Sequence, residues 1–203
     1  DDLAVYHPDT GNWYIRSMTG QIVAYPKPWG FSQVIPVPGD YDGDGKTDLA
    51  VYNRDTGKWF IFSLAANAAL AKGTSWGWID ALPVPGDYDG DGRADLAVYY
   101  RDTGYWYVLT MAGAILPVVK GVGDRESVPV PGDYDGDGRD DFAVYHRATG
   151  KWHIQSSTGA VLANGLSWGW KDALPVPGDY DGDGRADLAV YYRATGKWYI
   201  ITM

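Results

Sequence analysis

The chain has 203 residues and a formal net charge of −9, because 26 acidic side chains outnumber 17 Lys and Arg. All the acidic residues except Glu126 are Asp, and there is no cysteine. A hydrophobic fraction of 45% is enough for a packed core, so the composition excludes disorder. An acidic excess without a basic cluster excludes a nucleic acid as partner, and the lack of Cys excludes disulfides and thiolate sites. No apolar run approaches the roughly 20 residues that span a bilayer, so we expect no membrane insertion.

The chain consists almost entirely of an internal repeat. The string Pro-Val-Pro-Gly-Asp-Tyr-Asp-Gly-Asp-Gly recurs with its first Asp at positions 40, 87, 133 and 179, which gives periods of 47, 46 and 46 residues. The 27 Gly, 12 Pro, 16 Tyr and 10 Trp favour turns and strands over helices. The sequence therefore predicts an all-β protein built from repeated units.

The elements recur in one order along each unit. An Asp-rich loop leads into an alternating segment such as residues 48–52, a Gly-bearing turn at 55–57 and an aromatic segment at 58–62, and a second turn leads to a weaker apolar segment. Period-2 segments separated by such turns are typical of antiparallel strands, about four per unit. Four-stranded units of this length predict the blades of a β-propeller, and a solenoid of small sheets is the alternative.

The chain does not begin and end at unit boundaries. Residues 1–6 align with residues 140–145, so the first unit lacks its opening strand, and the last unit lacks its closing strand. The pattern predicts a single repeat domain over residues 1–203 with five blades, the first and last incomplete: 1–33, 34–80, 81–126, 127–172 and 173–203. This deficit fits a segment of a longer chain, and it also fits a ring completed by another copy through self-association.

The Asp-rich loops have the composition of a metal site. Residues 40–48 place carboxylates at loop positions 1, 3, 5 and 9, with Gly at position 6 for a sharp turn and a free backbone carbonyl at position 7. Hard oxygen ligands of this kind suit Ca²⁺, and four carboxylates in nine residues repel one another unless a cation neutralises them. An EF-hand would need Glu at position 12, where Val51 stands, and flanking helices. We therefore expect about four Ca²⁺ ions in loops that are not EF-hands.

The recurring Gly-Asp-Tyr-Asp-Gly-Asp-Gly-x-x-Asp-Leu-Ala-Val, with Phe142 in place of Leu in one copy, resembles the calcium-binding FG-GAP/VCBS-type repeats of integrin α-subunit propellers and bacterial surface proteins. This resemblance covers nearly the whole chain. It implies a calcium-stabilised propeller that is extracellular, on the cell surface or periplasmic. The ligands that it implies, including the backbone carbonyl of the Lys or Arg in each set, are Asp40, Asp42, Asp44, Lys46 and Asp48; Asp87, Asp89, Asp91, Arg93 and Asp95; Asp133, Asp135, Asp137, Arg139 and Asp141; and Asp179, Asp181, Asp183, Arg185 and Asp187.

Two sets of aromatic residues differ in their regularity. A Trp holds the same place in the aromatic segment of every unit, which predicts burial between blades, at Trp13, Trp59, Trp106, Trp152 and Trp198. A second set flanks an unchanging Gly and is lost in the unit that carries Val122 and Asp124. Such variable aromatics predict either a cover for the outer strand or a stacking platform for a ligand such as a sugar ring. The candidate ligand-binding residues are Trp29, Trp76, Trp78, Trp168 and Trp170.

No set of residues predicts catalysis. The three His residues stand in slots that other units fill with Asn, Tyr or Phe, and the lone Glu126 lies in a charged turn with Asp124 and Arg125. We predict a protein that is not an enzyme but a binding, adhesion or structural repeat module. Its expected ligand is a carbohydrate, as for some fungal lectins of the resembling family, or a protein at the cell surface. The alternative is the propeller part of a carbohydrate-active enzyme such as a polysaccharide lyase.

Overall fold

A computed structural model describes residues 2–203, and Asp1, with which the first predicted blade begins, lies outside them. The described residues form 17 strands and no helix, so the all-β prediction is confirmed. No helix in this part of the chain is long and apolar enough to cross a membrane. The strands belong to two compact units, which meet in the sequence between Pro83 and Val84.

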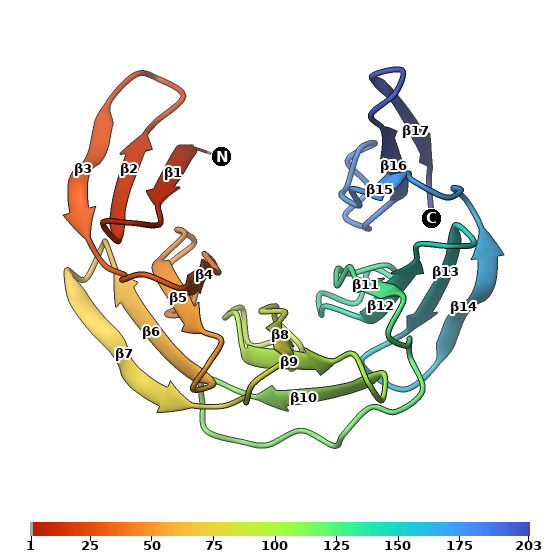
Figure 1. Ribbon diagram of the computed structural model, residues 1–203, viewed down its shortest axis with the longest axis horizontal. Coiled ribbons are helices and arrows are strands. Elements are labelled where there is room, and N and C mark those ends of the chain that lie inside the picture. The colour runs from red at the N-terminus through yellow and green to blue at the C-terminus, as the bar shows by residue number, and fades with distance from the viewer. Residues whose placement is uncertain (1) are drawn as a thin grey trace. The chain divides into compact units, whose positions relative to one another are not determined.

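The first unit contains two antiparallel sheets. The sheet of the first repeat has the order β1-β2-β3, and the sheet of the second repeat has the order β4-β5-β6-β7. Figure 1 shows each sheet as a meander in which neighbouring strands follow one another along the chain. The strands of this unit are β1 (Leu3–His7), β2 (Asn12–Arg16), β3 (Ile22–Pro28), β4 (Val34–Pro36), β5 (Leu49–Asn53), β6 (Lys58–Ser63), β7 (Ala68–Ser75) and β8 (Ala81–Pro83).

The second unit repeats this pattern. The fourth repeat forms the four-stranded sheet β11-β12-β13-β14, and the fifth forms β15-β16-β17. The strands of this unit are β9 (Leu96–Tyr100), β10 (Tyr105–Leu109), β11 (Ser127–Pro129), β12 (Phe142–His146), β13 (Lys151–Gln155), β14 (Val161–Ser167), β15 (Leu174–Pro175), β16 (Leu188–Tyr192) and β17 (Lys197–Ile201).

The third repeat lacks a regular outer strand. After β10 the chain makes only two isolated bridges with it, from Ile115 to Leu109 and from Val119 to Trp106. Pro117 lies between these bridges, where the second and fourth repeats have Ala71 and Ala163 in strands β7 and β14. Because proline has no N–H to donate and is poorly tolerated within a sheet, it interrupts the outer strand here.

The Trp of each aromatic segment is the centre of a junction between consecutive repeats. Trp13 packs with Leu49 and Val51 of the next repeat, and Trp152 packs with Leu188 and Val190. The expected burial is confirmed for the Trp residues of the first four repeats, which are at most 3% exposed. It is wrong for Trp198, which is 55% exposed, because no further repeat follows it among the described residues to cover its indole.

A glycine between two hydrogen-bonded carbonyls fixes the connection from one repeat to the next. In the fourth repeat the Trp152 indole N–H donates to the carbonyl of Trp168, and the Tyr145 hydroxyl donates to the carbonyl of Trp170. Between these carbonyls Gly169 has φ +136°, and a Cβ added to it would lie 2.5 Å from the Tyr145 hydroxyl oxygen. The same bonds recur in the first three repeats, so the backbone at this place requires glycine in each of them.

We predict that Trp152→Ala costs about 3–5 kcal/mol in the free energy of unfolding, because it empties the centre of a junction and removes an indole hydrogen bond. Trp198→Ala, at the same place in the fifth repeat, should cost less than about 1 kcal/mol because its side chain is already exposed. Urea denaturation of the two variants in dilute solution measures both values. Equal losses of unfolding free energy in the two variants would contradict this description of the junction.

Candidate metal centres

Each Asp-rich loop is folded by hydrogen bonds from its own backbone to its own carboxylates. In the first loop Asp40 accepts hydrogen bonds from the N–H groups of Gly43 and Gly45, both at 2.7 Å. A bridge between Gly39 and Asp48 closes the loop where it enters β5. The short Asp side chain can reach these N–H groups within the loop, and the glycines permit the positive φ angles of the turn. The loop therefore holds its first carboxylate in place without help from other elements.

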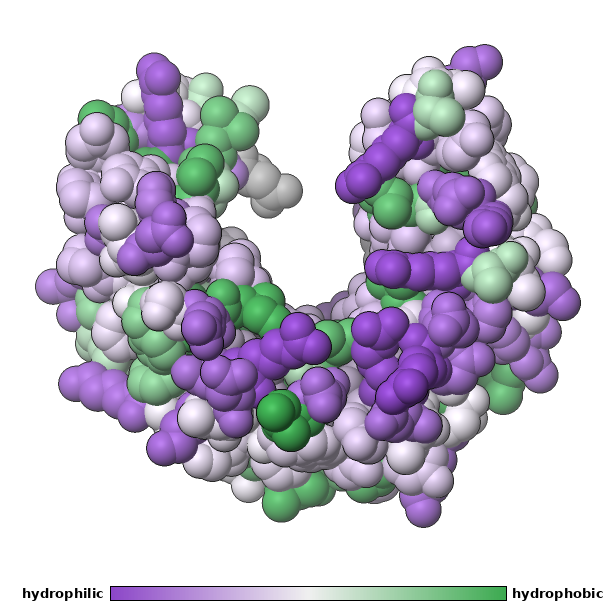
Figure 2. Space-filling view, viewed as in Figure 1, coloured by the Kyte–Doolittle hydropathy of each residue, from purple (hydrophilic) through white to green (hydrophobic). Residues whose placement is uncertain are grey.

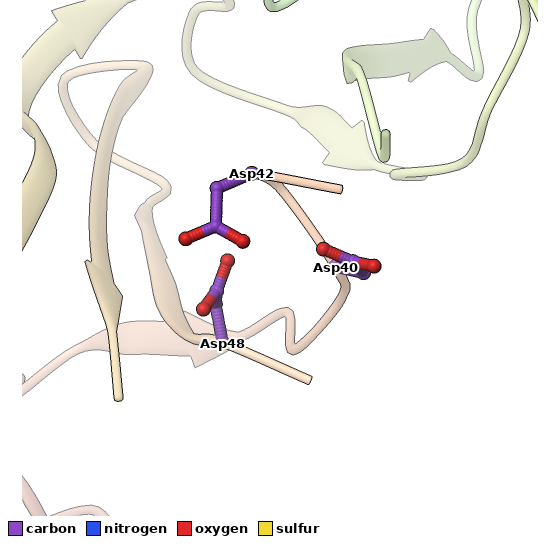
Figure 3. A group of neighbouring side chains, drawn as sticks. All are labelled: Asp40, Asp42 and Asp48. Carbon is purple, nitrogen blue, oxygen red and sulfur yellow. The ribbon is translucent and has the colours of Figure 1, made fainter. Parts of the chain in front are cut away.

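Three carboxylates of each loop converge on one point. The carboxylates at loop positions 1, 3 and 9 offer oxygen atoms that all lie within 4.8 Å of one another, and this arrangement is repeated four times. Figure 3 shows the carboxylates of Asp42 and Asp48 facing each other, with Asp40 beside them. The four triads are Asp40, Asp42 and Asp48; Asp87, Asp89 and Asp95; Asp133, Asp135 and Asp141; and Asp179, Asp181 and Asp187.

The carboxylate at position 9 is buried in every loop and joins the loop to the sheet. Asp95 accepts a hydrogen bond from the N–H of Tyr88 within the loop, and a second from the N–H of Met111 in the turn that follows β10. Burial raises the pKa of Asp95 to about 7, and it raises the pKa of Asp48 and of Asp141 to about 6, with further contributions from neighbouring loop carboxylates. These buried carboxylates lack a cationic side chain partner among the described residues, as expected of groups prepared for a metal ion.

The structure does not bring every predicted ligand into these triads. The carboxylate at position 5 lies outside them, and that of Asp44 instead accepts a hydrogen bond from the N–H of Lys46 at 2.9 Å. In the second loop Asp91 also forms an ion pair with Arg93, whose side chain lies 2.9 Å away. The ligand roles predicted for position 5 and for the position 7 carbonyl remain predictions.

The chemistry of the triads fits a hard divalent cation. Carboxylate oxygens alone, without nitrogen or sulfur ligands, are the donor set that Ca²⁺ and Mg²⁺ prefer, and a flexible Asp/Gly loop suits the larger and less demanding Ca²⁺. A bound cation would also stabilise the ionised form of the buried position 9 carboxylate. The four triads are therefore sites that could each hold one metal ion.

Consecutive loops of the second unit contact one another. The N–H of Asp140 donates to the carbonyl of Asp87, and the carboxylate of Asp140 accepts a hydrogen bond from the N–H of Asp87 at 2.8 Å. Burial raises the pKa of Asp140 to about 6. The sequence did not mark Asp140 as a candidate, because loop position 8 is Thr, Ala and Ala in the other loops and so follows no pattern. In the next pair of loops the N–H of Ala186 donates to the carbonyl of Asp133.

The aromatic residues before each connection fall into two groups. Trp29 and Trp168 are partly buried, and their indole N–H groups donate to carbonyls of the following repeat, at Phe60 and Tyr199. Trp76 is partly buried as well, whereas Trp78 is exposed. Trp170 is half-buried, and its ring meets the ring of Tyr199 edge-on with a centroid separation of 4.9 Å. Their role in ligand binding remains a prediction.

An open pocket of about 730 Å³ lies beside Trp170 in the second unit. Its lining includes Tyr192, whose ring also contacts the Trp170 ring edge-on at 5.4 Å. Charged side chains supply the remaining polar groups of the pocket: Glu126, Arg147, Lys171, Asp172 and Arg193. Aromatic, cationic and anionic side chains thus gather around one hollow that is large enough for a small ligand.

The histidines make only local contacts. The Nε2 atom of His146 lies 3.5 Å from a carboxylate oxygen of Asp124, and Nδ1 of His153 lies 3.1 Å from the amide oxygen of Asn164. The hydroxyl oxygen of Thr149, in an exposed turn, lies 3.0 Å from Nδ1 of His146. These contacts do not assign a reaction.

Comparisons with known proteins agree with this geometry. The model of the FG-GAP-like repeat matches residues 40–98, 87–144 and 133–190, so each match runs from one Asp-rich loop through the next. No curated protein matches the chain.

Solved structures with a similar fold include an Agrocybe aegerita lectin (TM-score 0.65, 15% identity, 98% of this chain and 59% of the lectin), described as recognising non-reducing terminal N-acetylglucosamine. Virginiamycin B lyase from Staphylococcus aureus (TM-score 0.58, 10% identity) matches over 100% of this chain and 66% of its own. A Bacteroides caccae protein of unknown function (TM-score 0.57, 12% identity) matches over 99% and 72%. The chain thus spans about three fifths to three quarters of the length of these proteins, and the likeness extends to a propeller-like fold.

We predict that the metal-free protein becomes less stable as the pH rises from about 4 to about 7. The folded chain keeps protons on Asp48, Asp95 and Asp141 in this range because their pKa values are raised to about 6 or 7, whereas the unfolded chain has released them. Thermal unfolding of protein dialysed free of metal, at several pH values, measures the trend.

Asp95→Asn should make that pH dependence shallower, because it removes one of the raised pKa values. Asp137→Asn, at the exposed position 5 of a neighbouring loop, is the matched control and should leave it unchanged. A metal-free protein that gains stability between pH 4 and pH 7 would contradict the role of the buried carboxylates.

Proposed function

Because the chain belongs to the family of FG-GAP-like repeat proteins, we propose that it is a calcium-stabilised, propeller-like binding module that acts outside the cell, at the cell surface or in the periplasm. Its ligand would be a carbohydrate or a protein at a cell surface, and a carbohydrate is favoured. The observation that carries the proposal is the hollow beside Trp170, which is lined by charged side chains and by Tyr192, whose ring contacts the Trp170 ring.

The calcium part of the proposal is supported by the electrostatics of the loops. Each triad sets three carboxylates within 4.8 Å of one another, and in a dehydrated site such like charges destabilise the fold unless they are neutralised or protonated. Four divalent ions would carry eight positive charges, close to the formal net charge of −9 in magnitude. A bound calcium ion would therefore neutralise the repulsion among the three carboxylates and hold the loop to its sheet.

The binding part of the proposal is supported by the third repeat, which lacks aromatic residues on either side of its glycine. There Val122 and Asp124 replace the aromatics, yet their carbonyls accept the same hydrogen bonds from Trp106 and Tyr99. The connection thus forms without an aromatic side chain at position 124, so an aromatic at this place in the other repeats is free to serve another role. Trp170 occupies this place next to the hollow.

A carbohydrate suits this hollow because a sugar ring has apolar faces that stack on aromatic side chains and hydroxyl groups that pair with charged ones. Arg147, Arg193 and Asp172 offer both donors and acceptors around the hollow. The similar Agrocybe aegerita lectin is described as recognising a terminal sugar, which supports this ligand class. The similarity to a lyase gives the enzyme alternative some support, but the described residues do not supply a positioned base and nucleophile next to Trp170.

We predict four bound Ca²⁺ ions per chain and a large loss of thermal stability on chelation. A ligand at 100 times its Kd contributes about 2.7 kcal/mol per site, so four sites would supply much of the stability of a domain. Calorimetric titration and elemental analysis measure the number of ions, and thermal unfolding with and without EDTA measures their effect. An unchanged melting temperature for protein shown to be free of metal would contradict the calcium part of the proposal.

Single-loop variants test the ligand assignment. Asp42→Ala, in the triad, and Asp44→Ala, at position 5, should each reduce the count to three ions, because the family pattern uses both positions. Asp55→Ala, in the exposed turn after β5, is the matched control and should keep four. Four bound ions in Asp44→Ala would show that the triad binds its ion without the carboxylate at position 5. Four bound ions in Asp42→Ala would show that the assigned site is wrong.

We predict that Trp170→Ala lowers carbohydrate binding by at least tenfold while it moves the melting temperature by only a few degrees, since Trp170 is half-buried and lies in the connection between β14 and β15. A glycan array with the wild type identifies the probe sugar, and titration of that sugar measures the affinity of each variant. Tyr25→Ala, an exposed aromatic on β3, is the control. Cleavage of a polysaccharide by the wild-type chain would instead favour the enzyme alternative.

A further inference from the structure

On the basis of the proposed carbohydrate-binding function, we propose that the hollow beside Trp170 selects acidic sugars, which carry a carboxylate or a sulfate group. Three cationic side chains line this hollow of about 730 Å³: Arg147, Lys171 and Arg193. None of the three forms an ion pair within the part of the chain that the structure describes. Their counterparts in the second and third repeats have partners, so the hollow differs from the earlier repeats in its unpaired positive charge.

The turn that bears the arginine keeps its sequence in four repeats except at the residue after the arginine. That residue is Asp in the second and third repeats and Ala in the fourth and fifth. The turn sequences are Arg-Asp-Thr-Gly at 54–57 and 101–104, and Arg-Ala-Thr-Gly at 147–150 and 193–196. Both alanines, Ala148 and Ala194, line the hollow. The arginine is exposed in the second, fourth and fifth repeats, so its exposure is a property of the turn itself.

The third repeat shows what the aspartate does at this turn. Asp102 accepts a hydrogen bond from Nε of Arg125 at 2.9 Å, and its carboxylate lies 2.8 Å from a terminal guanidinium nitrogen of the same residue. Arg101 donates to the backbone carbonyl of Arg125 at 2.8 Å. Both cations of this turn and its neighbouring connection therefore have partners within the chain.

The same pairing cannot form at the hollow. Lys171 holds the place of Arg125, but Ala148 holds the place of Asp102. Lys171 thus keeps the positive charge where the partner carboxylate is absent. A cation without an internal ion pair can bind an external anion without first breaking that pair, which lowers the cost of binding.

Two acidic side chains, Glu126 and Asp172, also line the hollow. Asp172 holds the place of Asp80, whose carboxylate lies 3.8 Å from Arg54, but it has no such pair among residues 2–203. Three cationic against two acidic side chains give the lining a net charge of +1, in a chain whose formal net charge is −9. A locally positive surface of this kind attracts an anionic ligand even when the whole protein is acidic.

The backbone positions the cationic residues around the hollow. The N–H of Arg147 donates to the carbonyl of Glu126 at 3.2 Å. The N–H of Ala173 donates to the carbonyl of Trp170, also at 3.2 Å, and this bond closes a turn that has Lys171 near its centre. The cations thus project from two turns that are each held by a main-chain hydrogen bond.

The hollow combines the groups that an acidic sugar needs. A guanidinium group such as that of Arg147 binds an oxyanion through two parallel hydrogen bonds, while the sugar ring can stack on an aromatic side chain such as Tyr192. Figure 2 shows hydrophilic residues over β11 and β12, the paired strands that lead into the Arg147 turn. A ligand that carries both a ring and an oxyanion fits this surface better than a neutral sugar does.

Matched sets of sugars test the proposal on the full chain in excess calcium. The glucose set is methyl β-glucoside, its 6-sulfate and methyl β-glucuronide, which differ only at carbon 6, and the galactose set is built in the same way. Ligand-detected NMR titration should show an acidic member of at least one set binding about tenfold tighter than its neutral member. Raising the salt from about 20 mM to about 500 mM should weaken the acidic member alone, because salt screens exposed charges. The two acidic members show whether the carboxylate or the sulfate is preferred.

Variants of the hollow locate the anion. Ala148→Asp restores the acid of the earlier repeats beside Lys171 and should remove the preference for acidic sugars, whereas Ala148→Asn, which has the same size without the charge, should keep it. Lys171→Gln removes a cation directly and should also reduce the preference. Arg54→Gln, at the same turn of the second repeat, is the control and should bind as the wild type does.

The outcomes separate this proposal from the proposed function. Equal affinity for acidic and neutral members in both sets would overturn the acidic preference and leave carbohydrate binding intact. No binding of any sugar, in these sets or on the glycan array, would overturn both. A preference that survives Ala148→Asp and Lys171→Gln would also overturn the proposal, because the anion would then bind elsewhere.

Discussion

One buried carboxylate at the end of each of the four Asp-rich loops ties the loop to the sheet. Asp141 accepts a hydrogen bond from the N–H of Tyr134 in its loop and another from the N–H of Ser157, in the turn after β13, while its oxygen also belongs to the metal triad. The loop, the start of β12 and the turn between β13 and β14 therefore share a single charged group. Because a buried charge is costly without compensation, the order of all three segments depends on what neutralises that group.

The connection between repeats is fixed by the glycine and the two carbonyls on either side of it, rather than by the side chains of the residues that flank the glycine. Trp and Tyr donate to two carbonyls on either side of a glycine, and a carbonyl does not depend on the side chain of its residue. This explains why Gly123 is retained in the third repeat while its neighbours become Val122 and Asp124. The fold thus leaves those flanking positions open to variation, which is the freedom that a binding site on a repeat protein needs.

The repetition in the sequence was enough to predict the all-β class, the strands and the four loops, since each prediction could be checked against copies of the same residue pattern. The repetition could not reveal the places where the structure of one repeat departs from that of the others. Trp198 follows the same Arg-Ala-Thr-Gly-Lys stretch as Trp152 but is exposed, because burial comes from the neighbouring repeat and not from the residue itself. Pro117 and Asp140 are each found in one unit alone, so the repeat pattern carried no signal for the interruption beside β10 or for the contact with the preceding loop.

Contacts between the loops of the second unit would extend the effect of a bound ion beyond its own repeat. Asp87 is a member of one triad, and its backbone N–H and carbonyl are both bonded to Asp140, which directly precedes Asp141 of the next triad. Arg139 lies over Gly90 of the same preceding loop, where a Cβ would come within 2.9 Å of its guanidinium nitrogen. An ion that orders one loop therefore also fixes the backbone that the next loop rests on. Since the repeats of such a chain are stabilised mainly by their neighbours, calcium would strengthen the junctions as well as the individual loops.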